Sequence, residues 1–225
     1  LGETEGTQAG SEVAVNLGKD TGTYKNVILG QPGQGADPAA TFNGTTSSVD
    51  IPKGTVKKSR DAAVELWFKN SLTGSAGPLL GYQDKALGSA STTGVPVLYV
   101  GTDRKLRGQF ATGSISPITS AAITDSNWHH VVLSSMGSTQ TMYLDGVKVG
   151  ELTGKTIDQT LLTFNQIGAA YATGAWPAWG DTPQRSYNGM IDEVSIYAGP
   201  LGPAAVTAHY QAATIQAQQL SKVTL

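Results

Sequence analysis

Apolar and polar residues alternate along this chain in short runs, which are separated by glycine, proline and polar turns. In residues 63–69 (AVELWFK), Val64, Leu66 and Phe68 fall on one face of an extended segment, and polar or aromatic residues fall on the other. A period of two is typical of a β-strand whose two faces meet different surroundings. Runs of this kind indicate an all-β protein.

The clearest hairpin lies in residues 128–152 (WHHVVLSSMGSTQTMYLDGVKVGEL). Asp145-Gly146 stands between two alternating runs, and this dipeptide is a strong signal for a two-residue turn between antiparallel strands. We therefore expect strands over residues 139–144 and 148–152, joined at this turn, with a further strand over residues 128–133.

Similar runs predict about a dozen strands in all. Beyond those above, they cover residues 13–17, 23–29, 40–51, 78–82, 95–102, 105–111, 161–168 and 190–197, and the segment 171–188 is expected to be a long loop. Pro203 suits the first turn of a short amphipathic helix that ends near Ala213. The pattern favours an all-β, two-sheet antiparallel sandwich or jelly roll in residues 1–213. Residues 214–225 are expected to form a linker or tail.

Composition narrows the possible partners. The net charge is −2 with 14% charged residues, so the chain lacks the basic character of a nucleic-acid-binding protein. It has no cysteine, which excludes disulfides and thiolate metal sites. No run of 18 apolar residues is present, and we expect no membrane insertion. Because the sequence begins at Leu1 without a signal peptide, we take it for a processed or excised piece of a longer protein.

Several segments together resemble a known family. They are LGETEGT, TGTYKNVILGQPG, ATFNGTTSSVDIP, AVELWFK, SNWHHVVLS with TMYLDGVKVGEL, and GMIDEVSIYAGPLGPAAVTAHYQAA. Their order and spacing are similar to those of the laminin-G-like, concanavalin A-like jelly rolls of bacterial extracellular and phage proteins. The resemblance implies an extracellular, secreted or virion-associated protein. It leaves function open, because this fold serves lectins, glycoside hydrolases, adhesion modules and spacers.

Asp192 is the most informative candidate metal ligand. Strand periodicity places it with Met190, Val194 and Ile196 on a core face. A carboxylate there is costly unless it is paired, hydrogen-bonded or metal-bound. The resemblance implies a structural calcium ion held by this aspartate and backbone carbonyls. It suggests Gly44 as a carbonyl donor, with Asp20 as a further candidate. The alternative is that Asp192 only accepts hydrogen bonds from loop amides.

The three histidines favour structural roles. His129 and His130 are adjacent on a strand, so their side chains point to opposite faces and cannot readily share one metal ion. We expect His129 to pack with its strand and His130 to form hydrogen bonds at the surface. His209, in the terminal helix, is expected to dock that helix onto a sheet.

The aromatic loop is the candidate ligand site. Trp176 and Trp179 lie among glycine and proline in AAYATGAWPAWGDTPQRSYNG. Aromatic faces beside planar polar groups suit sugar rings and also suit protein partners. The neighbouring side chains that would complete such a site are Tyr171, Asp181, Arg185 and Tyr187. The alternative is that these indoles pack locally and close the edge of the sandwich.

No catalytic residues are predicted. The chain lacks the Glu-x-Asp-x-(x)-Glu run of similar retaining glycosidases, and the adjacent Asp192 and Glu193 point to opposite faces. We therefore expect a non-catalytic lectin-like module of a larger protein that binds a glycan or cell-surface polysaccharide. The alternatives are a structural or adhesion spacer and an accessory domain of a glycoside hydrolase. Exposed indoles at Trp176 and Trp179 would favour a binder, and buried ones a spacer.

Overall fold

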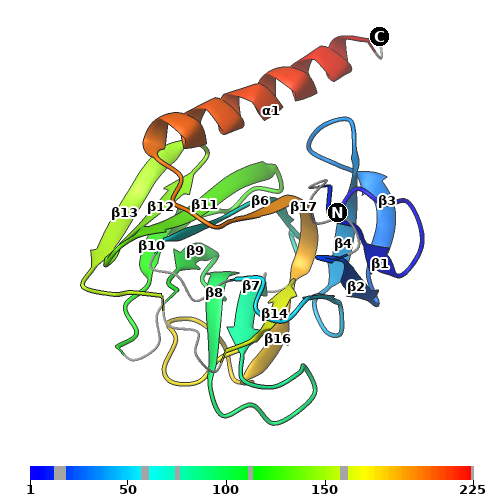
Figure 1. The fold of residues 1–225 in the computed structure, drawn as a ribbon. Coiled ribbons are helices and arrows are strands. Elements are labelled where there is room, and N and C mark those ends of the chain that lie inside the picture. The colour runs from blue at the N-terminus through cyan, green and yellow to red at the C-terminus, as the bar shows by residue number, and fades with distance from the viewer. Residues whose placement is uncertain (13–18, 57–60, 74–76, 111–113, 158–161, 224–225) are drawn as a thin grey trace.

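The computed structural model describes residues 1–12, 19–56, 61–73, 77–110, 114–157 and 162–223. Within these residues the chain forms seventeen strands and one helix (Figure 1). Two large antiparallel sheets and one two-stranded ribbon result. The predicted all-β sandwich is confirmed.

The strands divide between the sheets as follows. In spatial order, the eight-stranded sheet contains β1 (Gln8–Ala9), β2 (Gly22–Lys25), β5 (Ser48–Ile51), β14 (Phe164–Ile167), β7 (Gly77–Gln83), β8 (Gly94–Val100), β9 (Lys105–Gly108) and β10 (Ile118–Ala122). The seven-stranded sheet contains β13 (Val147–Thr153), β12 (Thr139–Leu144), β11 (Trp128–Met136), β6 (Ala62–Asn70), β17 (Asn188–Tyr197), β4 (Pro38–Asn43) and β3 (Ile28–Pro32). The ribbon pairs β15 (Ala169–Tyr171) with β16 (Gln184–Ser186), and the helix is α1 (Pro203–Val223).

The main core contains apolar side chains from both sheets. Phe68 of β6, Leu98 of β8 and Leu133 of β11 belong to one cluster and are fully buried. Strand β6 is buried on its other face as well, where Glu65 and Trp67 are largely hidden from solvent. A sheet buried on both faces needs a further layer over its outer side, and each large sheet has one.

The ribbon β15–β16 covers β7 and β8 of the eight-stranded sheet. Its backbone lies so close that a Cβ atom on Gly81 would stand 2.4 Å from the Cβ of Ala170. A Cβ atom on Gly94 would stand 2.2 Å from the carbonyl oxygen of Tyr171. Glycine is therefore required at both positions to let the ribbon reach the sheet.

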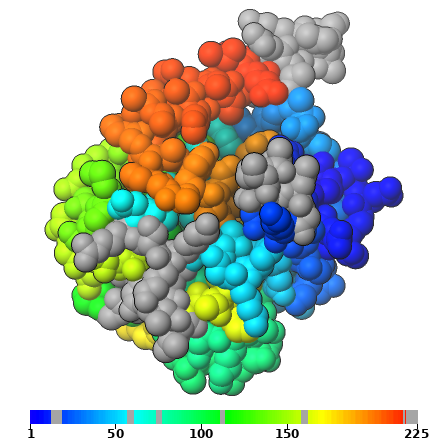
Figure 2. Space-filling model, viewed as in Figure 1, coloured from blue at the N-terminus to red at the C-terminus, as the bar shows by residue number. Residues whose placement is uncertain are grey.

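Helix α1 covers the outer face of the seven-stranded sheet, as Figure 1 shows, and forms a ridge on the surface in Figure 2. Val206 is fully buried in a small cluster with Val132 of β11 and Tyr143 of β12. One turn further along, the ring of Tyr210 stacks on Trp67 at 5.8 Å between centroids. This apolar contact is separate from the main core.

The predicted Asp145-Gly146 hairpin is confirmed. Leu144 pairs with Val147, so the two residues between them form the whole turn. Asp145 has φ 52° and Gly146 has φ 76°, as the favoured hairpin turns with two positive φ angles require.

Two predicted strands, 23–29 and 40–51, each divide into two strands that belong to different sheets. The first breaks at Asn26, which has φ 51°. The second breaks after Asn43, whose side-chain oxygen accepts hydrogen bonds from the backbone N–H groups of Thr45, Thr46 and Ser47. An asparagine that turns its own backbone in this way interrupts a strand without a glycine or proline signal.

The helix is longer than the sequence pattern predicts. It continues to Val223 rather than ending near Ala213, because glutamine, alanine, leucine and lysine, which make up six of the ten added residues, are good helix formers. The domain boundary placed at residue 213 thus falls inside α1. The weak strand predicted over residues 13–17 lies outside the described residues. Among the described helices, none combines the length and the apolar character needed to cross a bilayer.

Candidate functional site

The loop between β15 and β16 holds the two tryptophans in the protein interior. Trp176 is 6% exposed and Trp179 is 5% exposed. Their indole N–H groups donate to the carbonyl oxygens of Thr173 (3.0 Å) and Thr182 (2.9 Å). Both rings pack edge-to-face on Tyr99 of β8. Of the two alternatives that the sequence leaves open, the structure has local packing: both indoles cover the Tyr99 ring on the outer face of the eight-stranded sheet.

The other residues of the predicted ligand set do not form one open site. Tyr187 is fully buried and donates its hydroxyl to Asn70 Oδ1 at 3.0 Å, and burial raises the pKa of Tyr187 well above its ordinary range. Arg185 lies over the Trp179 ring and donates to the carbonyl oxygen of Trp179. Asp181 is exposed and Tyr171 is partly exposed. This loop is a packed cover with its polar groups turned inward.

A small pocket of about 280 Å³ remains at one edge of this cover. Its lining includes Trp176, Ile115 of the preceding loop, and the hydroxyl-bearing residues Thr93 and Thr173. Trp176 is thus the member of the predicted ligand set that lines this pocket.

Asp192 is buried at 1% exposure, but the strand phase around it differs from the prediction. Ile191 pairs with Phe68 and faces the core, and a bulge after Asp192 then turns Val194 and Ile196 toward the same core. Because of this bulge, the core-facing positions change from odd to even numbers. Asp192 shares its face with Met190, as predicted, but this is the outer face, and the predicted core face shared with Val194 and Ile196 is wrong.

The carboxylate of Asp192 accepts hydrogen bonds from two backbone amides. Gln34 N–H donates to Oδ2 at 2.9 Å and Glu193 N–H donates to Oδ1 at 3.0 Å. Burial nevertheless raises the pKa of Asp192 above its ordinary value. The loop-amide role left open by the sequence is thus present in the structure.

The structure does not bring the other predicted metal ligands to Asp192. Gly44 N–H bonds to the carbonyl oxygen of Tyr187, and Asn43 pairs with Asn188. Asn188 is four residues before Asp192, or about 13 Å along a strand. Asp20 precedes β2 and has no described contact with Asp192. Within the described residues, no three His, Cys, Asp or Glu side chains are arranged to hold a metal ion together.

One carbonyl oxygen does lie near this carboxylate. A Cβ atom placed on Gly33 would stand 2.2 Å from the carbonyl oxygen of Asp37 and 2.5 Å from Oδ2 of Asp192. Two oxygen atoms therefore converge in a space that only a glycine leaves open. Carboxylate and carbonyl oxygens are the ligands that calcium prefers.

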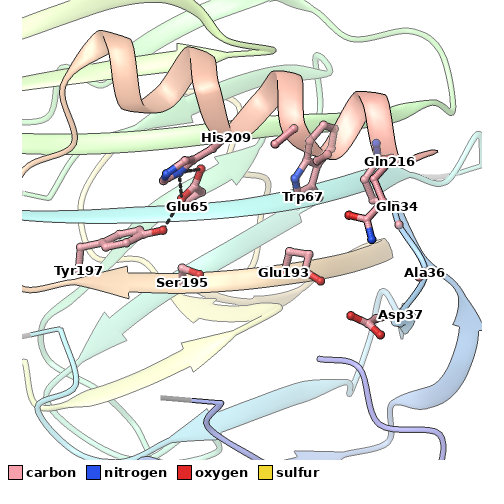
Figure 3. A pocket seen from close by; sticks show the side chains of 13 residues that line it. Gln34, Ala36, Asp37, Glu65, Trp67, Glu193, Ser195, Tyr197, His209 and Gln216 are labelled. Carbon is pink, nitrogen blue, oxygen red and sulfur yellow. Dashed lines mark hydrogen bonds and ion pairs between the residues drawn. The ribbon is translucent and has the colours of Figure 1, made fainter. Parts of the chain in front are cut away.

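A larger pocket, of about 390 Å³, lies between α1 and the seven-stranded sheet (Figure 3). We call it the α1 pocket. Its lining comes from four places: the loop before β4, strands β6 and β17, and the middle of α1. The residues are Gln34, Gly35, Ala36, Asp37, Glu65, Trp67, Glu193, Ser195, Tyr197, His209, Ala212, Ala213 and Gln216.

One end of the α1 pocket is closed by a hydrogen-bond network around Glu65. Its carboxylate accepts from His130 Nε2 at 2.7 Å, from the Tyr197 hydroxyl at 2.6 Å, and from His209 Nδ1 at 3.0 Å to each oxygen. Burial alone would raise the pKa of Glu65, but these donors hold it below its ordinary value. Burial and the bond to Glu65 raise the pKa of Tyr197 to about 12.

The contacts of the three histidines correct one prediction and confirm two. His130 is 1% exposed, so its expected surface position is wrong: α1 covers the face of the sheet that would otherwise be solvated. His129 packs against Phe68 at 5.7 Å between ring centroids, as expected for the opposite face. His209 docks α1 onto the sheet through Glu65, which confirms its expected role.

The other end of the α1 pocket is open and polar. Figure 3 shows Asp37, Gln34 and Gln216 grouped near Glu193. Glu193 sits at the bulge with φ 49°. Partial burial and the neighbouring charge of Asp192 raise the pKa of Glu193. Amides and carboxylates of this kind can receive and donate several hydrogen bonds to one ligand.

The sequence holds only part of the signal for this pocket. The alternation in β6 places Glu65 and Trp67 on the face opposite the core, and His209 is expected on a docking helix. The bulge at Glu193 and the approach of Gln34 and Asp37 depend on contacts between distant segments. Those residues carry no local pattern that marks them.

Comparison with known families identifies the fold. The Laminin_G_3 family model, described as the concanavalin A-like lectin/glucanases superfamily, matches residues 43–207. The chain belongs to this superfamily, as the resemblance in its sequence implies. No curated protein matches the chain.

Solved structures of low sequence identity share the fold. Domain 4 of AbnA, an extracellular arabinanase from Geobacillus stearothermophilus, was solved with arabinotriose. It has 20% identity and a TM-score of 0.55, over 83% of this chain and 86% of that chain. The sialidase of Trypanosoma rangeli has 15% identity and a TM-score of 0.63, over 93% of this chain and 31% of that chain. The binding domain of Paraclostridial Mosquitocidal Protein 1 has 13% identity and a TM-score of 0.57, over 92% of this chain and 51% of that chain. The chain therefore spans only part of the last two proteins.

Proposed function

We propose that this chain is a non-catalytic carbohydrate-recognition module of a larger extracellular or virion-associated protein, and that the α1 pocket receives the saccharide. The observation that carries the proposal is the makeup of that pocket: a concave site of about 390 Å³ with an indole, an imidazole, two hydroxyls, two amides and three carboxylates in its wall. A few directed polar groups that converge on one concave site are typical of small-ligand sites. Trp67 is 5% exposed and stacks on Tyr210, so it forms the floor of the pocket and offers no open aromatic face. Planar amides and carboxylates suit the vicinal hydroxyls of a sugar ring.

The family and its relatives support this proposal at the level of fold. The superfamily includes lectins by its own description, and the arabinanase domain was solved with a bound trisaccharide. A single shallow site of this kind binds weakly, so useful avidity would come from several copies acting together.

The state of Glu65 supports a role without catalysis. A glycosidase needs a general acid whose pKa is raised toward neutrality. Hydrogen bonds from His130, Tyr197 and His209 lower the pKa of Glu65 instead. This carboxylate is therefore suited to hold α1 in place, and it is not poised to protonate a leaving group.

The test is a polysaccharide and oligosaccharide binding screen. Wild type is compared with the double variant Gln34→Ala/Gln216→Ala, which removes both amides of the open end. Gln211→Ala, on an exposed part of the same helix outside the pocket, is the matched control. We expect at least one saccharide to bind wild type and the control, with binding reduced about tenfold in the double variant because two hydrogen bonds are lost. Equal binding by all three proteins would place the site elsewhere.

A structural calcium ion is part of the proposal, with a revised set of ligands. Asp192 and the carbonyl oxygen of Asp37 would hold the ion, in place of Gly44 and Asp20. The convergence of these two oxygens at Gly33 supports this choice. Calcium would offset the buried negative charge and fasten the loop before β4 to β17.

Removal of the ion tests this part directly. We expect a chelator to lower the melting temperature of wild type by several degrees. Asp192→Asn should have a lower melting temperature in calcium and no response to chelator, because the charged ligand is gone. Identical melting of wild type with calcium and with chelator would contradict a bound calcium ion.

The second candidate function is a structural or protein-adhesion spacer. The burial of Trp176 and Trp179 favours it, since these residues contribute packing and not an aromatic binding surface. A binding screen in which no saccharide binds wild type would move the assignment to this alternative. An accessory domain of a glycoside hydrolase remains compatible with saccharide binding and would be recognised from its neighbouring domains.

A further inference from the structure

The open end of the α1 pocket carries two carboxylates that are not used by the fold. Asp37 lies on the loop before β4 and Glu193 at the bulge of β17, and both side chains are exposed at the pocket. Among the described residues, no hydrogen bond or ion pair engages either carboxylate. Their negative charges are therefore available to a ligand.

The pocket offers no matching positive charge. In the part of the lining that the structure describes, neither lysine nor arginine contributes, and His209 is the one basic side chain. The ring of His209 donates to both oxygens of Glu65 at 3.0 Å and is committed to docking α1. The N-terminal ammonium acts on Asp192 and Glu193 from outside this lining, but an anionic ligand would find no lysine or arginine to pair with in the described wall of the pocket.

The uncharged polar groups at the open end do not distinguish a positively charged ligand from a negatively charged one. The amides of Gln34 and Gln216 can donate to and accept from sugar hydroxyls of any saccharide. They would hold the sugar frame, while Asp37 and Glu193 would decide which charged substituents are tolerated.

We infer that the α1 pocket, in its proposed role as a saccharide site, selects sugars that carry a free ammonium group and disfavours sugars that carry a carboxylate. The 2-amino-2-deoxy sugars with an unacetylated amine are the matching class. The inference rests on the proposed function and adds the charge of the ligand to it. An exposed ion pair changes affinity by up to about fivefold, and the two carboxylates together by about tenfold or more.

The experiment compares three trisaccharides: a glucosamine trimer with free amines, its fully N-acetylated counterpart, and a galacturonic acid trimer. It is run in chelator, because a calcium ion on Asp192 and the Asp37 carbonyl would offset the charge of the neighbouring carboxylates. Affinities are measured by calorimetry or NMR titration for wild type and for Asp37→Asn/Glu193→Gln. The control is Asp181→Asn/Glu5→Gln, which removes two exposed carboxylates outside the pocket. The two double variants have the same net charge, so non-specific attraction falls equally in both.

We expect wild type and the control to bind the glucosamine trimer at least about fivefold more tightly than the N-acetylated trimer. The galacturonic acid trimer should bind weakest. The preference should vanish in Asp37→Asn/Glu193→Gln and shrink at high ionic strength, where exposed charges are screened.

The possible failures are distinguishable. If the N-acetylated trimer binds wild type as well as the glucosamine trimer, or if the preference survives in Asp37→Asn/Glu193→Gln, the charge selectivity is wrong and the saccharide site stands. If none of the three trisaccharides binds, the charge selectivity fails, and the saccharide site stands or falls with the wider polysaccharide screen. Binding of a trilysine peptide in that last case would assign the ammonium specificity to a protein partner.

Discussion

The two large sheets are covered in different ways: one cover is packed throughout, and the other leaves a pocket. The cover of the eight-stranded sheet is aromatic: Trp176 and Trp179 pack on Tyr99, and their N–H groups bond within their own loop. The cover of the seven-stranded sheet is helix α1, which makes a small apolar contact around Val206 and leaves a polar pocket beside it. A cover that satisfies all its own groups is part of the core. A cover that leaves polar groups at its edge leaves a pocket, which we propose as the saccharide site.

The largest effect should come from the aromatic cover. We expect Trp179→Ala to lower the free energy of unfolding by about 3–5 kcal/mol, because a buried indole is replaced by a cavity. Denaturant unfolding measures the change. Leu72→Ala, at a residue 62% exposed, is the control and should change stability by less than about 0.5 kcal/mol. If Trp179→Ala were as stable as wild type, the claim that the aromatic cover belongs to the core would be wrong.

A smaller effect is expected at the helical cover. Glu65→Ala removes the acceptor for His130, Tyr197 and His209, and should cost about 2–3 kcal/mol of stability because buried donors lose their partner. Proteolysis should also cut α1 faster in this variant, since His209 no longer holds the helix. The matched control is Glu151→Ala, at a surface ion pair with Lys148, which should change stability by less than about 1 kcal/mol. Equal losses in both variants would contradict a docking role for Glu65.

The smallest effect lies away from both covers and depends on pH. His129 lies between Asp145 (2.8 Å) and Asp125 (2.9 Å). Burial alone would lower the pKa of His129, but these carboxylates raise it. The stability that His129 contributes is therefore complete below its ordinary pKa of about 6.5 and is lost as the pH rises through the raised value.

Melting curves measured from pH 5 to pH 9 test this sign. Wild type should lose stability across that range relative to His129→Gln, which cannot titrate at this position. Parallel curves for the two proteins would show that the ion pairs do not contribute.

The fold could be predicted because its strands follow local patterns. The alternation in β6 and the Asp145-Gly146 turn depend only on neighbouring residues, and the structure has both. The breaks at Asn26 and Asn43 were missed, because an asparagine in a run of β-forming residues does not by itself reveal that its side chain or a positive φ turns the chain. The sequence pattern predicts a loop where the ribbon β15–β16 lies, because each of its two strands is only three residues long.

The site could be predicted less well, since exposure is a property of the whole fold. Trp176 and Trp179 among glycine and proline have the composition of a ligand loop, yet Tyr99 of a distant strand buries them. His130 has the position of a surface residue until α1 covers its sheet. The open end of the α1 pocket joins residue 37 to residue 193, and no local sequence pattern connects them.

The most direct measurement is an NMR titration of the ¹⁵N-labelled protein with the saccharide that binds best in the screen. The chain has four tryptophans, so four indole N–H signals report on different places. We predict that the signal of Trp67 and the backbone amides of residues 34–37 shift with saccharide, while Trp179 stays unchanged. Shifts confined to Trp176 and Trp179 would contradict the account and return the binding site to the aromatic loop.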